Sequence, residues 1–81
     1  MSTHPERPFG TRLTLAPGGR HELLTAYVVS SNRTTGGYRY HCVFPYRNTT
    51  RWANVYSVEI ETIGDVDEAE TWRLLRLEEA R

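Results

Sequence analysis

The sequence has only one cysteine, no lysine and no long apolar run. Because one cysteine cannot form a disulfide within the chain, Cys42 excludes the disulfide framework on which most small secreted domains depend. The apolar runs are much shorter than the roughly 20 residues of a membrane-spanning helix, and the opening residues, MSTHPERP, lack the apolar stretch of a secretory signal. We therefore expect a soluble protein of the reducing cytoplasm that makes no membrane contact.

Charge is abundant but unevenly distributed along the 81 residues. Residues 1–57 carry seven arginines against two glutamates, a net charge of +5, whereas residues 58–81 carry three arginines against eight acidic residues, a net charge of −5. Apolar residues make up 38% of the chain, which is enough for one hydrophobic core in a chain too short for two. The sequence therefore predicts one globular domain that is basic in its first part and acidic in its last.

Alternation of apolar and polar residues predicts a series of short strands. Residues 9–16 alternate, residues 22–32 carry apolar side chains on both faces, and residues 38–44 alternate again and form a hairpin with the preceding segment. On the third strand, Tyr38, Tyr40, Cys42 and Phe44 lie on one side, and Arg39, His41 and Val43 lie on the other. We expect Tyr40, Cys42 and Phe44 to be buried and Arg39 and His41 to face outward. A turn is expected at residues 17–18, and Pro45 is expected to end the third strand because it lacks a backbone donor.

The two ends of the chain differ from this strand pattern. Residues 1–8 contain two prolines among polar residues, which predicts a flexible tail. Residues 65–81 predict a C-terminal helix packed on the rest of the domain, with Asp65 and Glu68 spaced as in a capping box. On a helical wheel Trp72 and Leu75 lie far from the main apolar side, so we expect both to point outward.

The segment RWANVYSVEIETI resembles the end of an SH3-like small barrel. It offers a Trp on the fourth strand, a helical turn at residues 54–57 and a closing strand at residues 58–63. The resemblance covers about residues 9–63. The SH3-like barrels that it points to include the KOW-like and Tudor-like modules of bacteria and phages. The resemblance implies a mainly β fold, a five-stranded SH3-like small barrel over residues 9–64 with a C-terminal α-helix. Members of this group generally bind protein or nucleic acid and are not enzymes.

The residue types that carry catalysis or bind metals do not form a plausible constellation. His41 and Cys42 are adjacent in a predicted strand, so they point to opposite faces and cannot share a metal ion or act as a thiolate–imidazole pair. The chain has no Cys or His spacing typical of zinc sites, and most acidic residues fall on the predicted helix, where a solvated face explains them. We expect no catalytic residue, no metal and no cofactor.

Arginines and aromatic residues gather around the predicted third and fourth strands and form the candidate site. Its members are Arg33, Arg39, His41, Tyr46, Arg47, Arg51 and Trp52, together with Trp72 of the helix. Arginine and aromatic side chains act as anchors in protein interfaces, and the same mixture binds single-stranded nucleic acid by phosphate pairing and base stacking. A solubilising rim around a buried aromatic core is a third interpretation.

The sequence therefore supports a non-enzymatic binding module that contacts another protein, as a regulator or inhibitor of bacterial or phage origin. The alternative is a nucleic-acid-binding accessory protein that uses the basic face, although the neutral overall charge favours a protein partner. A homodimer formed through the C-terminal helix is a further prediction, because a second copy would cover Trp72 and Leu75. The alternative is a monomer in which a groove of the barrel buries most of the helix.

Overall fold

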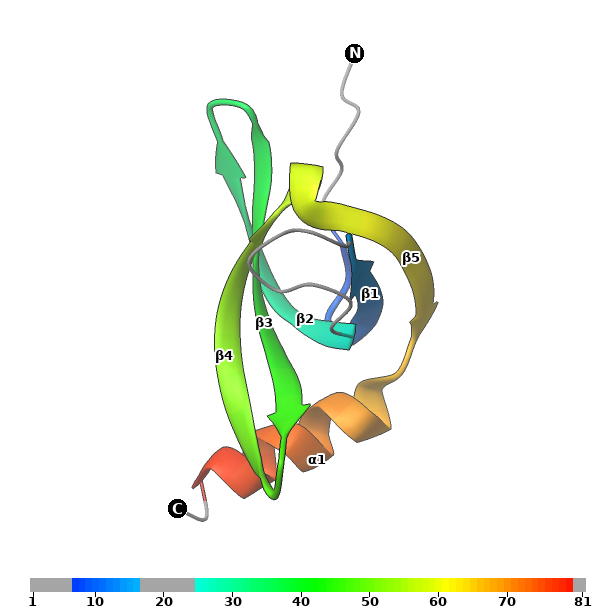
Figure 1. Ribbon diagram of the computed structural model, residues 1–81, viewed down its shortest axis with the longest axis vertical. Helices are drawn as coiled ribbons and strands as arrows, with labels where there is room; N and C mark the ends of the chain where they lie inside the picture. The colour runs from blue at the N-terminus through cyan, green and yellow to red at the C-terminus, as the bar shows by residue number, and fades with distance from the viewer. Residues whose placement is uncertain (1–6, 17–24, 80–81) are drawn as a thin grey trace.

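The computed structural model describes residues 7–16 and 25–79 (Figure 1). Along the chain its elements are β1 (Thr11–Leu15), β2 (Thr25–Thr34), β3 (Gly37–Tyr46), β4 (Thr49–Tyr56), the 3-10 helix η1 (Ser57–Glu59), β5 (Ile60–Val66) and α1 (Glu68–Glu79). Residues 1–6 of the tail predicted at residues 1–8, the predicted turn at residues 17–18 and the start of the predicted second strand lie outside the described residues, whereas Arg7 and Pro8 form hydrogen bonds to the strands. The structure is thus mainly β, with five strands and a C-terminal helix.

The five strands form one antiparallel sheet in the order β4-β3-β2-β1-β5. β4 pairs with β3 and β5 pairs with β1, so these two strands are the edges of the sheet. The prediction of a barrel is therefore wrong, because closure would require a ladder between β4 and β5. After β4 the chain passes through η1 and crosses to the other edge of the sheet, where it forms β5 (Figure 1). The helix α1 packs on β4.

The hydrophobic core lies on the inner face of this curved sheet. Its buried members are Leu13, Leu15, Ala26, Val28, Tyr40, Cys42, Phe44, Ala53 and Val55. Each strand from β1 to β4 contributes alternate residues, as expected when one face of a strand is buried. The predicted burial of Tyr40, Cys42 and Phe44 is confirmed, and Tyr38 packs against the core while remaining partly exposed.

Val43 lies on the face of β3 that also carries Arg39 and His41, and it is completely buried there. That face is covered by α1, which packs against β4, β3 and β2. The buried hydroxyl of Thr50 in β4 donates a 2.6 Å hydrogen bond to the carbonyl of Leu74, which is itself fully buried. The helix thus gives the sheet a second, smaller apolar layer, as the apolar residues on both faces of the second strand required.

Pro45 also departs from its prediction, because β3 continues through it to Tyr46 and pairs Pro45 with Thr50. The ladder between β2 and β3 reaches only as far as Val43 at this end, so Pro45 has a neighbouring strand on one side alone. A proline is tolerated at such a position because no second ladder needs its missing N–H.

The helix begins three residues later than predicted, at Glu68. Its first turn is capped by Asp67, whose Oδ1 accepts a 3.0 Å hydrogen bond from the backbone N–H of Glu70. Thr71 and Leu74 form its buried side, and Trp72 is 51% exposed with its ring centroid 5.0 Å from that of Phe9. Of the helices in the described part of the chain, none has the length and apolar character needed to cross a membrane.

Candidate functional site

The β3–β4 hairpin positions most of the residues that the sequence singled out. Its two strands pair from Arg39–Tyr56 to Tyr46–Thr49, and residues 47–48 make the turn. Arg47 adopts a left-handed conformation there, with φ of 58°, which a two-residue hairpin turn requires. The turn therefore returns the chain at once and sets the first residues of β4 against the last residues of β3.

One group at the turn, which we call the tip cluster, consists of Tyr46, Arg47 and Arg51. The guanidinium carbon of Arg51 lies 4.4 Å from the centre of the Tyr46 ring, and that of Arg47 lies 5.4 Å from it. Both distances are within the range of a cation–π interaction. All three side chains are exposed, so the cluster presents two positive charges around one aromatic ring at the surface.

The opposite face of the same hairpin carries a stacked pair, His41 and Trp52. Their ring centroids are 4.4 Å apart and the rings are nearly parallel, at 21°. The imidazole Nδ1 donates to the side-chain oxygen of Asn54 at 3.0 Å, which fixes the orientation of the ring. Trp52 remains 39% exposed, so this pair is a rigid aromatic surface that solvent or a ligand can reach.

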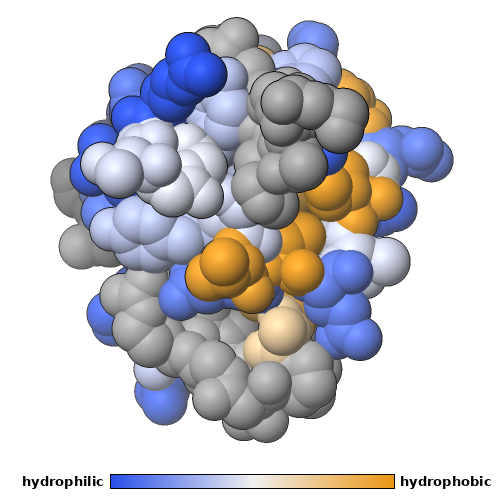
Figure 2. Space-filling model, turned by 90° about the horizontal axis from the view of Figure 1, so that it is seen from above, coloured by the Kyte–Doolittle hydropathy of each residue, from blue (hydrophilic) through white to orange (hydrophobic). Residues whose placement is uncertain are grey.

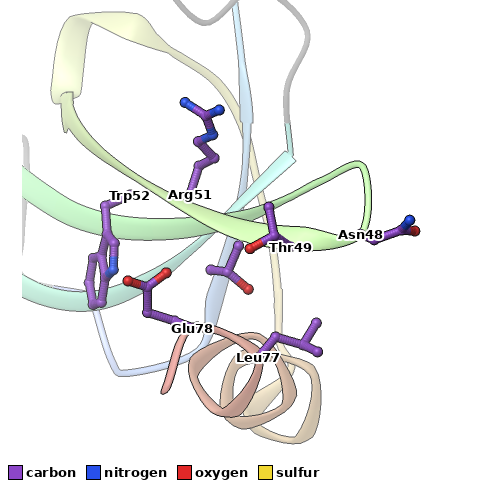
Figure 3. Close-up of a pocket in the computed structure, with 7 residues that line it drawn as sticks. Asn48, Thr49, Arg51, Trp52, Leu77 and Glu78 are labelled. Carbon is purple, nitrogen blue, oxygen red and sulfur yellow. The ribbon is translucent and has the colours of Figure 1, made fainter. Parts of the chain in front are cut away.

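A pocket of about 710 Å³ lies between the start of β4 and the end of α1 (Figure 3). It is lined by Asn48, Thr49, Thr50, Arg51, Trp52, Leu77 and Glu78. The Trp52 ring and the Glu78 carboxylate lie on the side of β4 that faces the helix, whereas the Arg51 side chain points to the other side of the strand (Figure 3). The pocket therefore combines the Trp52 ring, the aliphatic side chain of Leu77 and the Glu78 carboxylate, and the guanidinium of Arg51 lies on the opposite side of β4.

Of the remaining predicted site residues, Arg39 lies two residues from His41 on the same face of β3, whereas Arg33 and Trp72 lie apart from the tip cluster and the stacked pair. Arg39 is partly buried and pairs with Tyr56 on the far half of the hairpin. Arg33 is exposed near the other end of β3, opposite Tyr38. Trp72 lies on α1 against Phe9. The eight residues therefore do not form one continuous surface, and the structure divides the predicted site at the β3–β4 hairpin.

Leu77, Glu78 and the two threonines of the pocket were missed by the sequence reasoning. The sequence predicted a turn at the two threonines, which the structure places in β4, and it assigned Glu78 to a solvated acidic face. Only the packing of α1 on β4 brings the helix end beside Trp52. No local pattern carries that information, although the apolar residues on both faces of the second strand indicated that some element would cover the outer face.

The chemistry of the buried thiol is consistent with a structural role. Burial raises the pKa of Cys42 to about 12, and its Sγ lies 3.6 Å from the carbonyl oxygen of Tyr40. His41 and Cys42 occupy opposite faces of β3, as predicted. Within residues 7–16 and 25–79, no group of three or more His, Cys, Asp or Glu side chains is arranged to hold a metal ion.

No protein-family model, no curated protein and no solved structure matches this chain. A fold by itself does not specify a function, so the function has to be inferred from the geometry and chemistry of the site.

Proposed function

We propose that this chain is a non-enzymatic module that binds a partner protein along the edge of β4. The observation that carries the proposal is that β4 is an edge strand with recognition groups on both of its faces. Side chains alternate along a strand, so Arg51 joins the tip cluster while Trp52 faces the pocket beside α1. An extended segment that paired with β4 would place its own side chains alternately against these two surfaces.

The chemistry of the two faces defines the segment that fits. On the pocket side, Trp52 and Leu77 favour an apolar side chain or the stem of a long basic one, whose charge would be attracted by Glu78. On the other side, Arg51 favours a carboxylate. We therefore expect a partner strand in which acidic residues alternate with apolar or basic ones. The pocket volume of about 710 Å³ is within the range of ligand-binding sites, and it is large enough for one such side chain.

The position of α1 argues against nucleic acid as the partner. Binding of nucleic acid by the basic face requires the acidic helix to lie away from the contact surface. Instead, α1 packs against β4, and Glu78 lines the same pocket as Trp52. Both Nε and one terminal nitrogen of Arg73 donate to Glu70, so that arginine is already neutralised by its own helix. A phosphate backbone on the Trp52 side would therefore meet a negatively charged neighbour.

The order of the elements supports a relationship to SH3-like modules. The second and third strands form a hairpin, Trp52 lies on the fourth strand, and a helical turn precedes the last strand. That turn lies at η1, about three residues later than the sequence predicted. A domain of this kind acts by holding or blocking its partner, so regulation or inhibition is the role we propose.

The proposal is tested by affinity capture from a lysate of the source organism, using the wild-type chain and two variants. Trp52→Ala removes the aromatic wall of the pocket, and Arg33→Ala removes an exposed arginine at the other end of the sheet. We expect a protein that is retained by the wild type and by Arg33→Ala and is lost with Trp52→Ala. A captured set that Trp52→Ala leaves unchanged, or the capture of no protein, contradicts the proposal.

Fluorescence anisotropy with a labelled single-stranded oligonucleotide tests the alternative function. We expect no binding at physiological ionic strength. If the affinity for the oligonucleotide falls steeply between low and physiological salt, and is weaker in Arg39→Ala or Arg47→Ala, the result favours nucleic-acid binding over protein binding.

A further inference from the structure

Arg7 is held firmly at the inner side of the sheet. Its backbone N–H donates to Ser31 Oγ and its carbonyl accepts from the same hydroxyl, both at 3.3 Å. The next carbonyl, of Pro8, accepts hydrogen bonds from both the backbone N–H and the hydroxyl of Thr11, at 3.1 and 2.7 Å. These contacts fix the Arg7 backbone beside β2.

The guanidinium of Arg7 contains a buried donor, Nε, which is shielded from solvent. Within residues 7–16 and 25–79, no atom accepts a hydrogen bond from this Nε. The same guanidinium donates to the phenol of Tyr40, whose pKa is raised by burial, an effect that this hydrogen bond and the Arg7 charge partly oppose. A buried donor on a charged group is costly to leave unpaired. An acceptor on a ligand that reached this Nε would therefore be bound favourably.

A cavity of about 300 Å³ adjoins this donor. Arg7 and Tyr40 line it together with Ser57 and the first residues of β5, including Ile60 and Ile63. Ser57 Oγ already accepts from the backbone N–H of Tyr38 at 3.1 Å and donates to its carbonyl at 3.0 Å, so it holds the wall in place. The cavity thus combines the cationic donor of Arg7 with the aliphatic side chains of Ile60 and Ile63, and Glu61 and Thr62 complete its lining.

The surface beside this cavity is apolar. A second cavity, of about 280 Å³, shares Ser57 and is lined by Tyr38, Tyr56 and Val58, which is 84% exposed. Figure 2, which looks onto the end of the molecule where η1 lies, shows apolar side chains grouped beside hydrophilic ones. A ligand that enters here therefore meets an apolar surface next to the Arg7 guanidinium, with the Glu61 carboxylate at the same cavity.

We propose that the Arg7 cavity binds a carboxylate attached to an aliphatic group, as in the C-terminal residue of a peptide. Such a residue carries its carboxylate and its aliphatic side chain on one carbon atom, which matches a donor and aliphatic walls in one small cavity. Glu61 also lines the cavity and disfavours ligands of higher negative charge, such as phosphate. The site shares no residue with the pocket beside α1 and does not depend on the function proposed for β4.

The test is a ¹H–¹⁵N NMR titration of the full chain with acetyl-glycyl-leucine and with its C-terminal amide. We expect the Arg7 Nε–H signal to shift with the free acid and to stay in place with the amide. Arg7→Lys keeps the charge but removes Nε, so it should weaken binding about tenfold, the loss of one charge-assisted hydrogen bond. Glu61→Gln removes the competing carboxylate and should tighten binding, whereas Arg33→Lys, outside both cavities, should leave it unchanged.

Several outcomes would overturn the proposal. Equal shifts with the acid and the amide would show that the carboxylate is not recognised. Equal affinity for acetate would show that the site takes any small anion, and tighter binding of acetyl-glutamate amide would assign it to an acidic side chain. Arg7→Lys is uninformative if its spectrum loses the dispersion of a folded chain. In that case the affinity of Glu61→Gln for acetyl-glycyl-leucine is the test, and a value no higher than that of the wild type refutes the site.

Discussion

Two neighbouring residues of β3, His41 and Cys42, show how far single positions can be predicted from the sequence. Strand alternation correctly placed the thiol in the core and the imidazole on the other face. Val43 lies on the same face as His41 and is nevertheless completely buried, because that face is partly covered by a helix from a distant part of the chain. Alternation therefore gives the face of a residue, whereas its burial also depends on long-range packing.

Phe44 provides a test of the core at this scale. Its side chain is almost completely buried among core residues of the inner face, so we expect Phe44→Ala to reduce the free energy of unfolding by about 3–5 kcal/mol, measured by chemical denaturation. Tyr46, an exposed aromatic on the same strand, serves as the matched control, and Tyr46→Ala should cost much less. Equal losses for the two variants would show that the core does not include Phe44.

Cys42 gives a prediction about pH. In the unfolded chain the thiol ionises near its ordinary pKa of 9.0, whereas in the folded chain burial raises this pKa to about 12. Between these values the unfolded state has lost its proton and the folded state has kept it, so stability must fall as pH rises. Burial also raises the pKa of Tyr27 and Tyr40, which gives a slope of the same sign.

Comparison with Cys42→Ala isolates the thiol, because the variant retains both tyrosines. We expect the unfolding free energy of the wild type to decrease more steeply than that of the variant between about pH 9 and pH 12, the range set by the two pKa values of the thiol. Parallel profiles, measured by urea denaturation at each pH, would contradict a buried neutral thiol.

The C-terminal helix shows why the presence of an element is easier to predict than the residue at which it begins. Two pairs, Asp65 with Glu68 and Asp67 with Glu70, have the same three-residue spacing, so the capping pattern allows two starting points. The structure uses the second because β5 continues through Val66, which pairs with Thr11 of β1. The strand therefore takes up the residues that would otherwise have formed the first cap, and local sequence cannot resolve this competition.

Asp67 is the residue to change at this scale. Loss of the bond from Glu70 N–H in Asp67→Ala should cost about 1 kcal/mol of unfolding free energy, whereas Asp67→Asn should cost much less because asparagine is an equally good cap. Asp65→Ala is the control, since Asp65 lies in β5. If Asp65→Ala proves the more costly of the two alanine variants by thermal denaturation, the helix begins where the sequence pattern first placed it.

At the scale of the whole molecule, local pairings were predictable and closure was not. The hairpin of β2 and β3 and the turn before the last strand follow from short stretches of sequence. The open edge between β4 and β5 and the docking of α1 depend on contacts between distant residues. The arrangement of the candidate site also depends on contacts between distant residues. The hairpin brings Tyr46, Arg47 and Arg51 together, whereas Glu78 reaches the pocket only because the helix packs on β4.

The assembly state is the prediction that belongs to this scale. The sequence predicted a dimer through the helix because Trp72 and Leu75 were both expected to face outward. In the structure Phe9 packs beside the Trp72 ring and Leu75 is partly buried, which leaves less apolar surface for a second copy to cover. We therefore expect light scattering at tens of micromolar to give the mass of one chain, unchanged by Trp72→Ala. A mass of two chains that Trp72→Ala halves would establish the dimer.

The attachment of α1 to both edges of the sheet has a mechanical consequence. The helix follows β5 in the chain, at one edge, and it is bound to β4, at the other edge, through packing and the hydrogen bond from Thr50 to Leu74. A pulling force applied to the C-terminus reaches the contact between α1 and β4 before it reaches the ladder between β1 and β5. The first rupture event would therefore release the helix, and the five-stranded sheet would yield only in a later one.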